Sequence, residues 1–161
     1  MREIIVVANN IRSTHNVGSI FRTSEGFGVT KIILSGYTPY PEIDGDTRLP
    51  HIREKITAQI HKTALGAESI VPFEYQPELD LSRLKSEEYL IVGLELDDRA
   101  INISDYRPTE KIVLLLGEEV EGIPRGLRDQ CDDLIEIPMR GQKESFNVSV
   151  ACGIALYQLS K

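Results

Sequence analysis

The first stretch of this chain with the means to do chemistry is a polar turn near the N-terminus, "NNIRSTHNVGSIFRTSEGFGV". It follows the apolar run "EIIVVA" and carries Asn16 and Arg22 on either side of Gly18. A strand, turn and helix in this order often bind phosphate, but the G-x-G-x-x-G spacing of a dinucleotide site is absent here. An amide and a guanidinium instead suit hydrogen bonds to hydroxyl and phosphate groups.

Two segments near the C-terminus also begin with an apolar run and continue into a polar turn or loop. "IVLLLGEEVEGIP" places Glu119 between Gly117 and Gly122, and glycines permit close backbone approach or a positive φ. In "IEIPMRGQKESFNVSVACGIAL", Ser145 is expected to cap the final helix and leave free N–H groups for a ligand, with Asn147 in the first turn. Taken singly, each segment is also typical of an ordinary capped turn.

Alternating strands and helices must position these segments. Apolar, β-branched runs predict strands at residues 3–8, 31–36, 69–75, 89–96, 111–118 and 133–138. Helical patterns predict helices at residues 16–28, 51–65, 77–86, 123–131 and 145–161. Several strands are apolar on both faces, so we expect an α/β fold with a mostly parallel sheet covered by helices on both faces.

Length and composition point to one domain without a metal or a membrane segment. The 161 residues contain no repeat and no Pro- or Gly-rich linker, which predicts a single domain over residues 1–161. No apolar run is long enough to cross a bilayer, and the N-terminus lacks a signal-peptide cleavage site, so a cytoplasmic protein is expected. Cys131 and Cys152 stand far from any His cluster, which favours free thiols over a zinc site or a disulfide.

Charge limits the ways in which the chain can meet nucleic acid. The formal net charge of −7 argues against non-specific coating of nucleic acid, because phosphate contacts require Lys and Arg. Two segments are locally basic: "TRLPHIREK", with Arg48, Arg53 and Lys55, and "PMRGQKES", with Arg140 and Lys143. A nucleic-acid partner would bind at such patches, and ordinary solvated surface charge is the alternative.

The three polar segments, in this order and at this spacing, resemble the motifs of the SpoU (TrmH-like) branch of the SPOUT RNA methyltransferases. The matching residues are Asn16 and Arg22 in the first motif, Glu119 in the second, and Ser145, Phe146 and Asn147 in the third, where Phe146 replaces a leucine. The stretch between Tyr37 and Glu110 adds little beyond its rhythm of strands and helices.

This resemblance implies an S-adenosylmethionine-dependent enzyme that methylates a ribose 2′-hydroxyl of tRNA or rRNA. It also implies a deep trefoil knot in the C-terminal part of the chain, and a homodimer with the active site near the subunit interface. The chain is similar in extent to the smallest members of the family. RNA recognition is therefore expected from the catalytic domain itself, the dimer or a partner protein.

The resemblance also assigns roles to individual residues. The implied catalytic residues are Arg22, Asn16, Glu119, Ser145 and Asn147. The implied cofactor-binding residues are Leu116, Gly117, Glu119, Ile137, Met139, Ser145, Phe146 and Asn147, with adenine held by backbone groups in an apolar slot. Because a guanidinium has a pKa above about 12, we expect Arg22 to bind phosphate and stabilise charge on the 2′-oxygen rather than accept its proton.

Two other functions remain open. The first is a catalytically silent, RNA-associated binding module that has kept the fold and the S-adenosylmethionine pocket. The joint presence of the five implied catalytic residues counts against it, and Arg22 would be the first lost in a silent relative. The second is an unrelated Rossmann-like protein that binds a phosphorylated nucleotide, against which the missing G-x-G-x-x-G counts.

Overall fold

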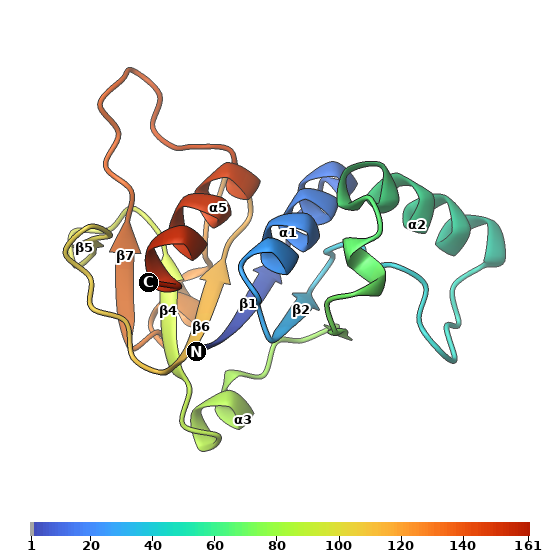
Figure 1. The fold of residues 1–161 in the computed structure, drawn as a ribbon, viewed down its shortest axis with the longest axis horizontal. Helices are drawn as coiled ribbons and strands as arrows, with labels where there is room; N and C mark the ends of the chain where they lie inside the picture. Colours follow the sequence, from blue (N-terminus) through green and yellow to red (C-terminus); the bar gives the residue numbers. More distant parts are fainter. Residues whose placement is uncertain (1) are drawn as a thin grey trace.

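The molecule is built on one parallel sheet of seven strands in the order β3-β2-β1-β6-β4-β7-β5 (Figure 1). The structure is a computed structural model and describes residues 2–161. All neighbouring strands pair in parallel. The strands are β1 (Glu3–Asn9), β2 (Lys31–Ser35), β3 (Phe73–Gln76), β4 (Leu90–Leu94), β5 (Ile101–Asn102), β6 (Lys111–Leu116) and β7 (Asp133–Glu136).

Helices cover both faces of this sheet. They are α1 (Thr14–Gly26), α2 (Pro50–Ala64), α3 (Leu81–Ser86), α4 (Arg125–Arg128) and α5 (Val148–Leu159), with a short 3₁₀ turn at Ala67–Ser69. Alternate residues of β1 enter opposite hydrophobic layers: Ile4 and Val6 pack with α1, α2 and α5, and Ile5 and Val7 pack with α3 and α4. The predicted fold class is thereby confirmed.

Several predicted boundaries were wrong for local reasons. The strand expected at 69–75 is confined to Phe73–Gln76, because the 3₁₀ turn at Ala67–Ser69 occupies the chain just before it. The helix expected at 77–86 begins only at Leu81, where the Asp80 carboxylate accepts a hydrogen bond from the Ser82 N–H. Strand β5 was missed, because two residues are too short to show a period.

The start of the last helix also differs from the expectation. Asn147, rather than Ser145, is its N-cap: the Asn147 Oδ1 atom accepts hydrogen bonds from the N–H groups of Ser149 (3.0 Å) and Val150 (3.4 Å). Asn and Ser cap helices about equally well, so the sequence did not distinguish two candidates so close together. Ser145 and Phe146 therefore remain in an extended loop before α5.

The sequence also led to expectations about a knot, a membrane helix and a metal site. A strand order by itself does not establish a knot, so the trefoil knot implied by the resemblance stays a prediction. Within residues 2–161, no helix combines the length and the apolar character needed to cross a membrane. The same residues bring together no group of three or more His, Cys, Asp or Glu side chains suited to a metal ion.

Candidate active site

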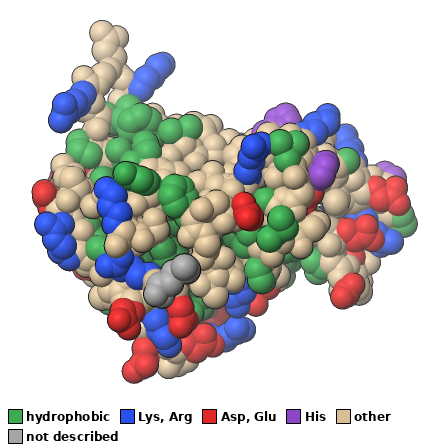
Figure 2. All heavy atoms as spheres, in the orientation of Figure 1, with side chains coloured by type: hydrophobic (Ala, Val, Ile, Leu, Met, Phe, Trp, Pro, Cys, Tyr) green, Lys and Arg blue, Asp and Glu red, His purple; other side chains and the backbone are tan. Residues whose placement is uncertain are grey.

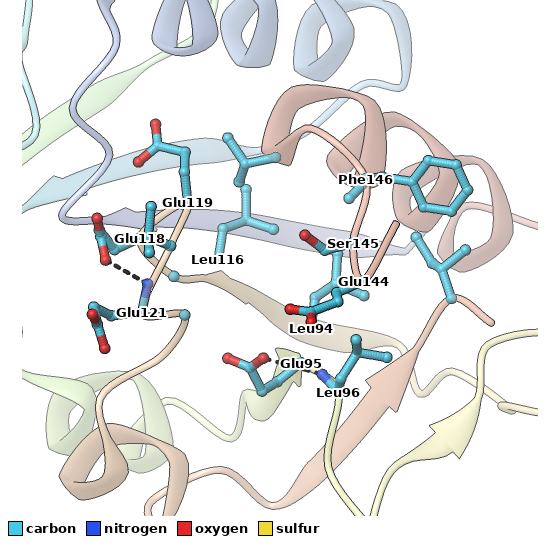
Figure 3. Close-up of a pocket in the computed structure, with 16 residues that line it drawn as sticks. Leu94, Glu95, Leu96, Leu116, Glu118, Glu119, Glu121, Glu144, Ser145 and Phe146 are labelled. Atoms are coloured by element: carbon cyan, nitrogen blue, oxygen red, sulfur yellow. Dashed lines mark hydrogen bonds between the residues drawn. The ribbon is translucent and has the colours of Figure 1, made fainter. Parts of the chain in front are cut away.

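The candidate site lies where parallel strands end at a common edge of the sheet. A cavity of about 250 Å³ opens there between the turns that follow β4 and β6 and the loop that leads into α5 (Figure 3). Its walls are residues 94–96 after β4, residues 116–122 at the end of β6, Ile137 after β7, residues 144–146 before α5, and Val148 and Ala151 of α5. The second and third sequence motifs thus face each other across the cavity.

The turn after β6 is shaped by its two glycines. The Glu118 N–H donates to the Gly122 carbonyl (3.1 Å) and the Gly122 N–H donates back to the Glu118 carbonyl (2.9 Å), which closes a tight loop. A Cβ atom on Gly117 would lie 2.3 Å from the Gly122 carbonyl carbon. Gly122 itself has a φ of +71°, which favours glycine. The loop that carries Glu119 therefore depends on both glycines.

Glu95 is a cavity residue that the sequence interpretation missed. It follows β4, and its Oε2 atom accepts a hydrogen bond from the Ile123 N–H (2.7 Å), while Oε1 accepts one from the Leu96 N–H (3.1 Å). These bonds tie the end of β4 to the turn after β6. Its position just beyond the carboxyl end of a buried strand was the available signal.

A chain of hydrogen bonds links all three motifs. The Asn16 Nδ2 atom donates to Glu119 Oε1 (3.2 Å), and the Asn147 Nδ2 atom donates to Asn16 Oδ1 (3.2 Å). Asn16 thus stands between the loop after β6 and the start of α5. Residues more than a hundred positions apart in sequence meet at one point beside the cavity.

Arg12 contacts two glutamates of the turn after β6, beside the Glu119–Asn16 hydrogen bond. Its Nε atom lies 3.5 Å from Glu118 Oε1, and its backbone N–H donates to Glu119 Oε2 (3.4 Å). The nearby Tyr37 and, to a lesser degree, Glu118 raise the pKa of the Arg12 guanidinium above its ordinary value. Arg12 is therefore a permanent positive charge beside the turn after β6.

The predicted site residues fall into three groups. Those that line the cavity are Leu116, Gly117, Glu119, Ile137, Ser145 and Phe146. Asn16 and Asn147 lie next to it, joined to Glu119 by the hydrogen bonds described above. Met139 and Arg22 do not line it. Arg22 is exposed further along α1, so the single chain does not bring it to the cavity. The roles assigned to these residues remain predictions.

The two basic segments have different surroundings. Arg48 turns inward: it forms an ion pair with Asp46 (2.6 Å), donates to the Tyr40 carbonyl (2.9 Å) and lies over the Tyr40 ring. Hydrogen bonds from Arg48 hold the pKa of Asp46 well below its usual range. Arg53 pairs with Glu42 at 2.9 Å. Much of the charge in this segment therefore fastens the loop between β2 and α2.

The basic residues of the second segment, "PMRGQKES", are exposed to solvent. Arg140 and Lys143 are exposed in the loop between β7 and α5, which projects from the body of the molecule (Figure 1). Lys and Arg side chains are visible on this projection in Figure 2. This loop offers basic groups next to the residues that line the cavity.

Comparison with known proteins gives a consistent picture. Residues 3–157 match the model of the SpoU rRNA Methylase family. The chain is 31% identical over 160 residues to the 23S rRNA (guanosine-2′-O-)-methyltransferase RlmB of Coxiella burnetii, covering 98% of this chain and 58% of that protein. It is also 31% identical over 160 residues to the tRNA (guanosine(18)-2′-O)-methyltransferase of Aquifex aeolicus, covering 99% of this chain and 70% of that protein.

Solved structures agree with this assignment at the level of the fold. The Aquifex aeolicus TrmH/SpoU tRNA modifying enzyme aligns with a TM-score of 0.79 at 26% identity, over 99% of this chain and 75% of that one. The AdoMet-bound rRNA methyltransferase from Sinorhizobium meliloti aligns with a TM-score of 0.80 at 24% identity, over 98% of this chain and 55% of that one. The chain spans little more than half the length of several curated relatives. With the family model matched over nearly its whole length, the chain belongs to the SpoU rRNA methylase family.

Proposed function

We propose that residues 1–161 form one S-adenosylmethionine-dependent methyltransferase domain that methylates a ribose 2′-hydroxyl in tRNA or rRNA. The observation that carries the proposal is the bonded series Glu119–Asn16–Asn147, which unites the three motifs beside a cavity. The named activities of the Coxiella and Aquifex relatives, both guanosine 2′-O-methyltransferases, support the same reaction.

The charges of the cavity fit a cationic cofactor better than a polyphosphate. Its walls include five glutamates and no Lys or Arg among the residues that the structure describes, namely Glu95, Glu118, Glu119, Glu121 and Glu144. Several of them are drawn in Figure 3. Negative walls attract a sulfonium and an ammonium group and repel phosphates. The apolar side chains of Leu94, Leu116 and Ile137 provide a surface for a purine ring.

The protein's task in such a reaction is placement. S-adenosylmethionine would supply a methyl group that is already activated on a sulfonium. Asn16, fixed by Glu119 and Asn147, would orient the ribose, and accurate placement of reacting groups lowers a barrier by about 7–11 kcal/mol in favourable cases. Arg22 would bind the neighbouring phosphate and stabilise charge on the 2′-oxygen, whose proton then passes to phosphate or water.

We further propose a homodimer that completes this site, working in the cytoplasm. A shallow hollow on the outer face of α1 and α5 is lined by Ser19, Thr23, Ser149, Val150, Gly153, Ile154 and Tyr157. Val150 and Tyr157 are half-exposed apolar side chains there, and the small residues around them permit close approach of a second helix pair. Arg22 also lies on α1 and does not line the cavity of its own chain. Formation of the dimer is therefore the step that would bring it to the ribose.

The test is isothermal titration followed by methyl transfer. The purified protein is titrated with S-adenosylhomocysteine, S-adenosylmethionine and ATP, and we expect the first two to bind at about one per chain and ATP not to bind. Labelled S-adenosylmethionine is then supplied with tRNA and rRNA from cells that lack the gene, and modified riboses are mapped. Cofactor binding without transfer would favour the silent module, and binding of ATP alone would contradict the assigned pocket.

A further inference from the structure

An exposed arginine and an exposed tyrosine lie together beside the cavity, and neither is among the residues matched to the family motifs. The Arg12 guanidinium carbon is 5.7 Å from the centroid of the Tyr37 ring. The Arg12 side chain is 72% exposed, and Tyr37 is 53% exposed. Side by side, a guanidinium group and an aromatic ring offer a ligand both a positive charge and a flat surface for stacking.

The two turns that carry this pair are locked to each other. The backbone of Tyr37 is held by Asn10, whose Oδ1 atom accepts a hydrogen bond from the Tyr37 N–H (3.1 Å). Asn10 has a φ of 57° and Gly36 a φ of 65°, both in the left-handed region. A Cβ on Gly36 would lie 1.8 Å from Asn10 Oδ1, so the contact requires glycine.

Buried hydrogen bonds beneath the pair add rigidity. The Ser35 hydroxyl donates to Asn9 Oδ1 (2.8 Å), and the Thr38 hydroxyl accepts from the Ile11 N–H (3.0 Å) and donates to the Ala8 carbonyl (2.9 Å). These bonds join the end of β1, just before Arg12, to the end of β2, on both sides of Tyr37 in the sequence. Strained backbone held by such bonds is characteristic of functional sites.

Arg12 also links the Arg12–Tyr37 pair to Glu118 and Glu119 in the turn after β6. Its Nε edge faces the Glu118 carboxylate, whose side chain is only 6% exposed. Its backbone N–H reaches Glu119, the acid bonded to Asn16. One edge of the guanidinium is thereby anchored, and the exposed remainder of the side chain points its charge toward solvent next to the proposed reaction centre.

We propose that Arg12 and Tyr37 form the subsite for the RNA nucleotide adjacent to the methylated ribose. Tyr37 stacks on an unpaired base and Arg12 binds the phosphate beside it. The proposal rests on the proposed function, because it takes the substrate to be RNA. Aromatic side chains and guanidinium groups are the usual binding surfaces for splayed-out RNA bases and their phosphates. A single arginine and tyrosine are too small a surface for a stable protein partner.

The experiment measures RNA binding by fluorescence anisotropy, with saturating S-adenosylhomocysteine present. The probes are a fluorescein-labelled RNA hairpin with an unpaired loop, and a fully paired RNA duplex of the same length. The variants are Tyr37→Ala, Tyr37→Phe, Arg12→Ala and Arg12→Lys. Arg83→Ala is the matched control, because Arg83 is an exposed arginine on α3, in the layer on the other face of the sheet.

We expect Tyr37→Ala to weaken hairpin binding at least roughly five-fold and to abolish the preference for hairpin over duplex, whereas Tyr37→Phe keeps both. Arg12→Ala should weaken binding and lower the slope of log K against log salt by about one, with Arg12→Lys intermediate. Arg83→Ala should bind like the wild type. Unchanged titration of S-adenosylhomocysteine shows that each variant is folded and has an intact cavity.

Several results would overturn the proposal. One is hairpin affinity that stays unchanged in both alanine variants, and another is a wild type that binds neither RNA. A third is a wild type without any preference for the unpaired loop. The proposed function is judged separately, by methyl transfer from the wild-type protein. A wild type that transfers methyl groups and variants with unaltered KM for RNA would leave the function standing and remove the subsite.

Discussion

Asn16 occupies the centre of the site at the level of single residues. Within residues 2–161, it is the one side chain that forms hydrogen bonds to both other motifs, through Glu119 on one side and Asn147 on the other. A side-chain amide suits this position because it donates and accepts at the same time. The arrangement explains in physical terms why an amide pair and a carboxylate occur at these three points.

Arg22 is expected to act on the reaction and not on cofactor binding. Because its side chain is exposed and lies outside the cavity wall, Arg22→Ala should leave the affinity for S-adenosylhomocysteine close to that of the wild type. Loss of a charge-stabilising donor should lower turnover by about a hundred-fold or more. Titration calorimetry and single-turnover methyl transfer measure the two quantities. An equal loss of binding and turnover would contradict this role, and Arg22→Lys should recover part of the rate.

Asn147 combines a structural and a functional task that two variants can separate. Asn147→Ala removes both the helix cap and the hydrogen bond from the Asn147 side-chain amide to Asn16. It should therefore cost about 1 kcal/mol of stability and weaken cofactor binding. Asn147→Ser keeps a capping oxygen and should restore the unfolding free energy but not the affinity for the cofactor. Urea unfolding and titration calorimetry provide the measurements. Wild-type cofactor affinity in the serine variant would show that capping is the only task of Asn147 in the cofactor site.

At the level of elements, the turn between β6 and α4 is the least tolerant part of the site. Gly117 has no room for a side chain, whereas Gly126 on α4 has no heavy atom within 4 Å of an added Cβ. Gly117→Ala should therefore open the turn, destabilise the protein by about 2 kcal/mol or more, and abolish cofactor binding. Gly126→Ala, its matched control, should be neutral or slightly stabilising, because alanine favours a helix.

Thermal unfolding followed by titration with S-adenosylhomocysteine distinguishes these two glycine variants. The close approach would be disproved if Gly117→Ala kept both the stability and the affinity of the wild type. Loss of stability in Gly126→Ala would show that alanine is harmful anywhere in this segment, and the effect at Gly117 would then lose its specific meaning.

At the level of the whole molecule, the prediction concerns assembly. The outer face of α1 and α5 carries half-exposed Val150 at its hollow, so Val150→Asp should bury a charge in the proposed interface and yield monomers. Sedimentation velocity would measure the shift from dimer to monomer. Methyl transfer should fall with it, while S-adenosylhomocysteine still binds if the cavity of each chain suffices for the cofactor. A wild type that sediments as a monomer would refute the proposed dimer.

The sequence by itself determined the features that depend on neighbouring residues. Apolar runs such as that of β6 predicted the strands, and their two-sided apolar character predicted a parallel sheet with two helical layers. Local order along the chain was sufficient for these elements. The residues of the cavity wall after β6 and before α5 were predicted in a different way, through the resemblance of the three motifs to the SpoU family.

Only the tertiary structure decided how distant segments meet. The Glu119–Asn16–Asn147 series, the bonds of Glu95 in the cavity wall and the contact of Arg12 with Tyr37 all join turns and helix ends from separate parts of the chain. The exclusion of Arg22 from the cavity and the inward turn of Arg48 are decided in the same way. Such contacts depend on strand order and on the packing of helices across the sheet, which no local pattern encodes.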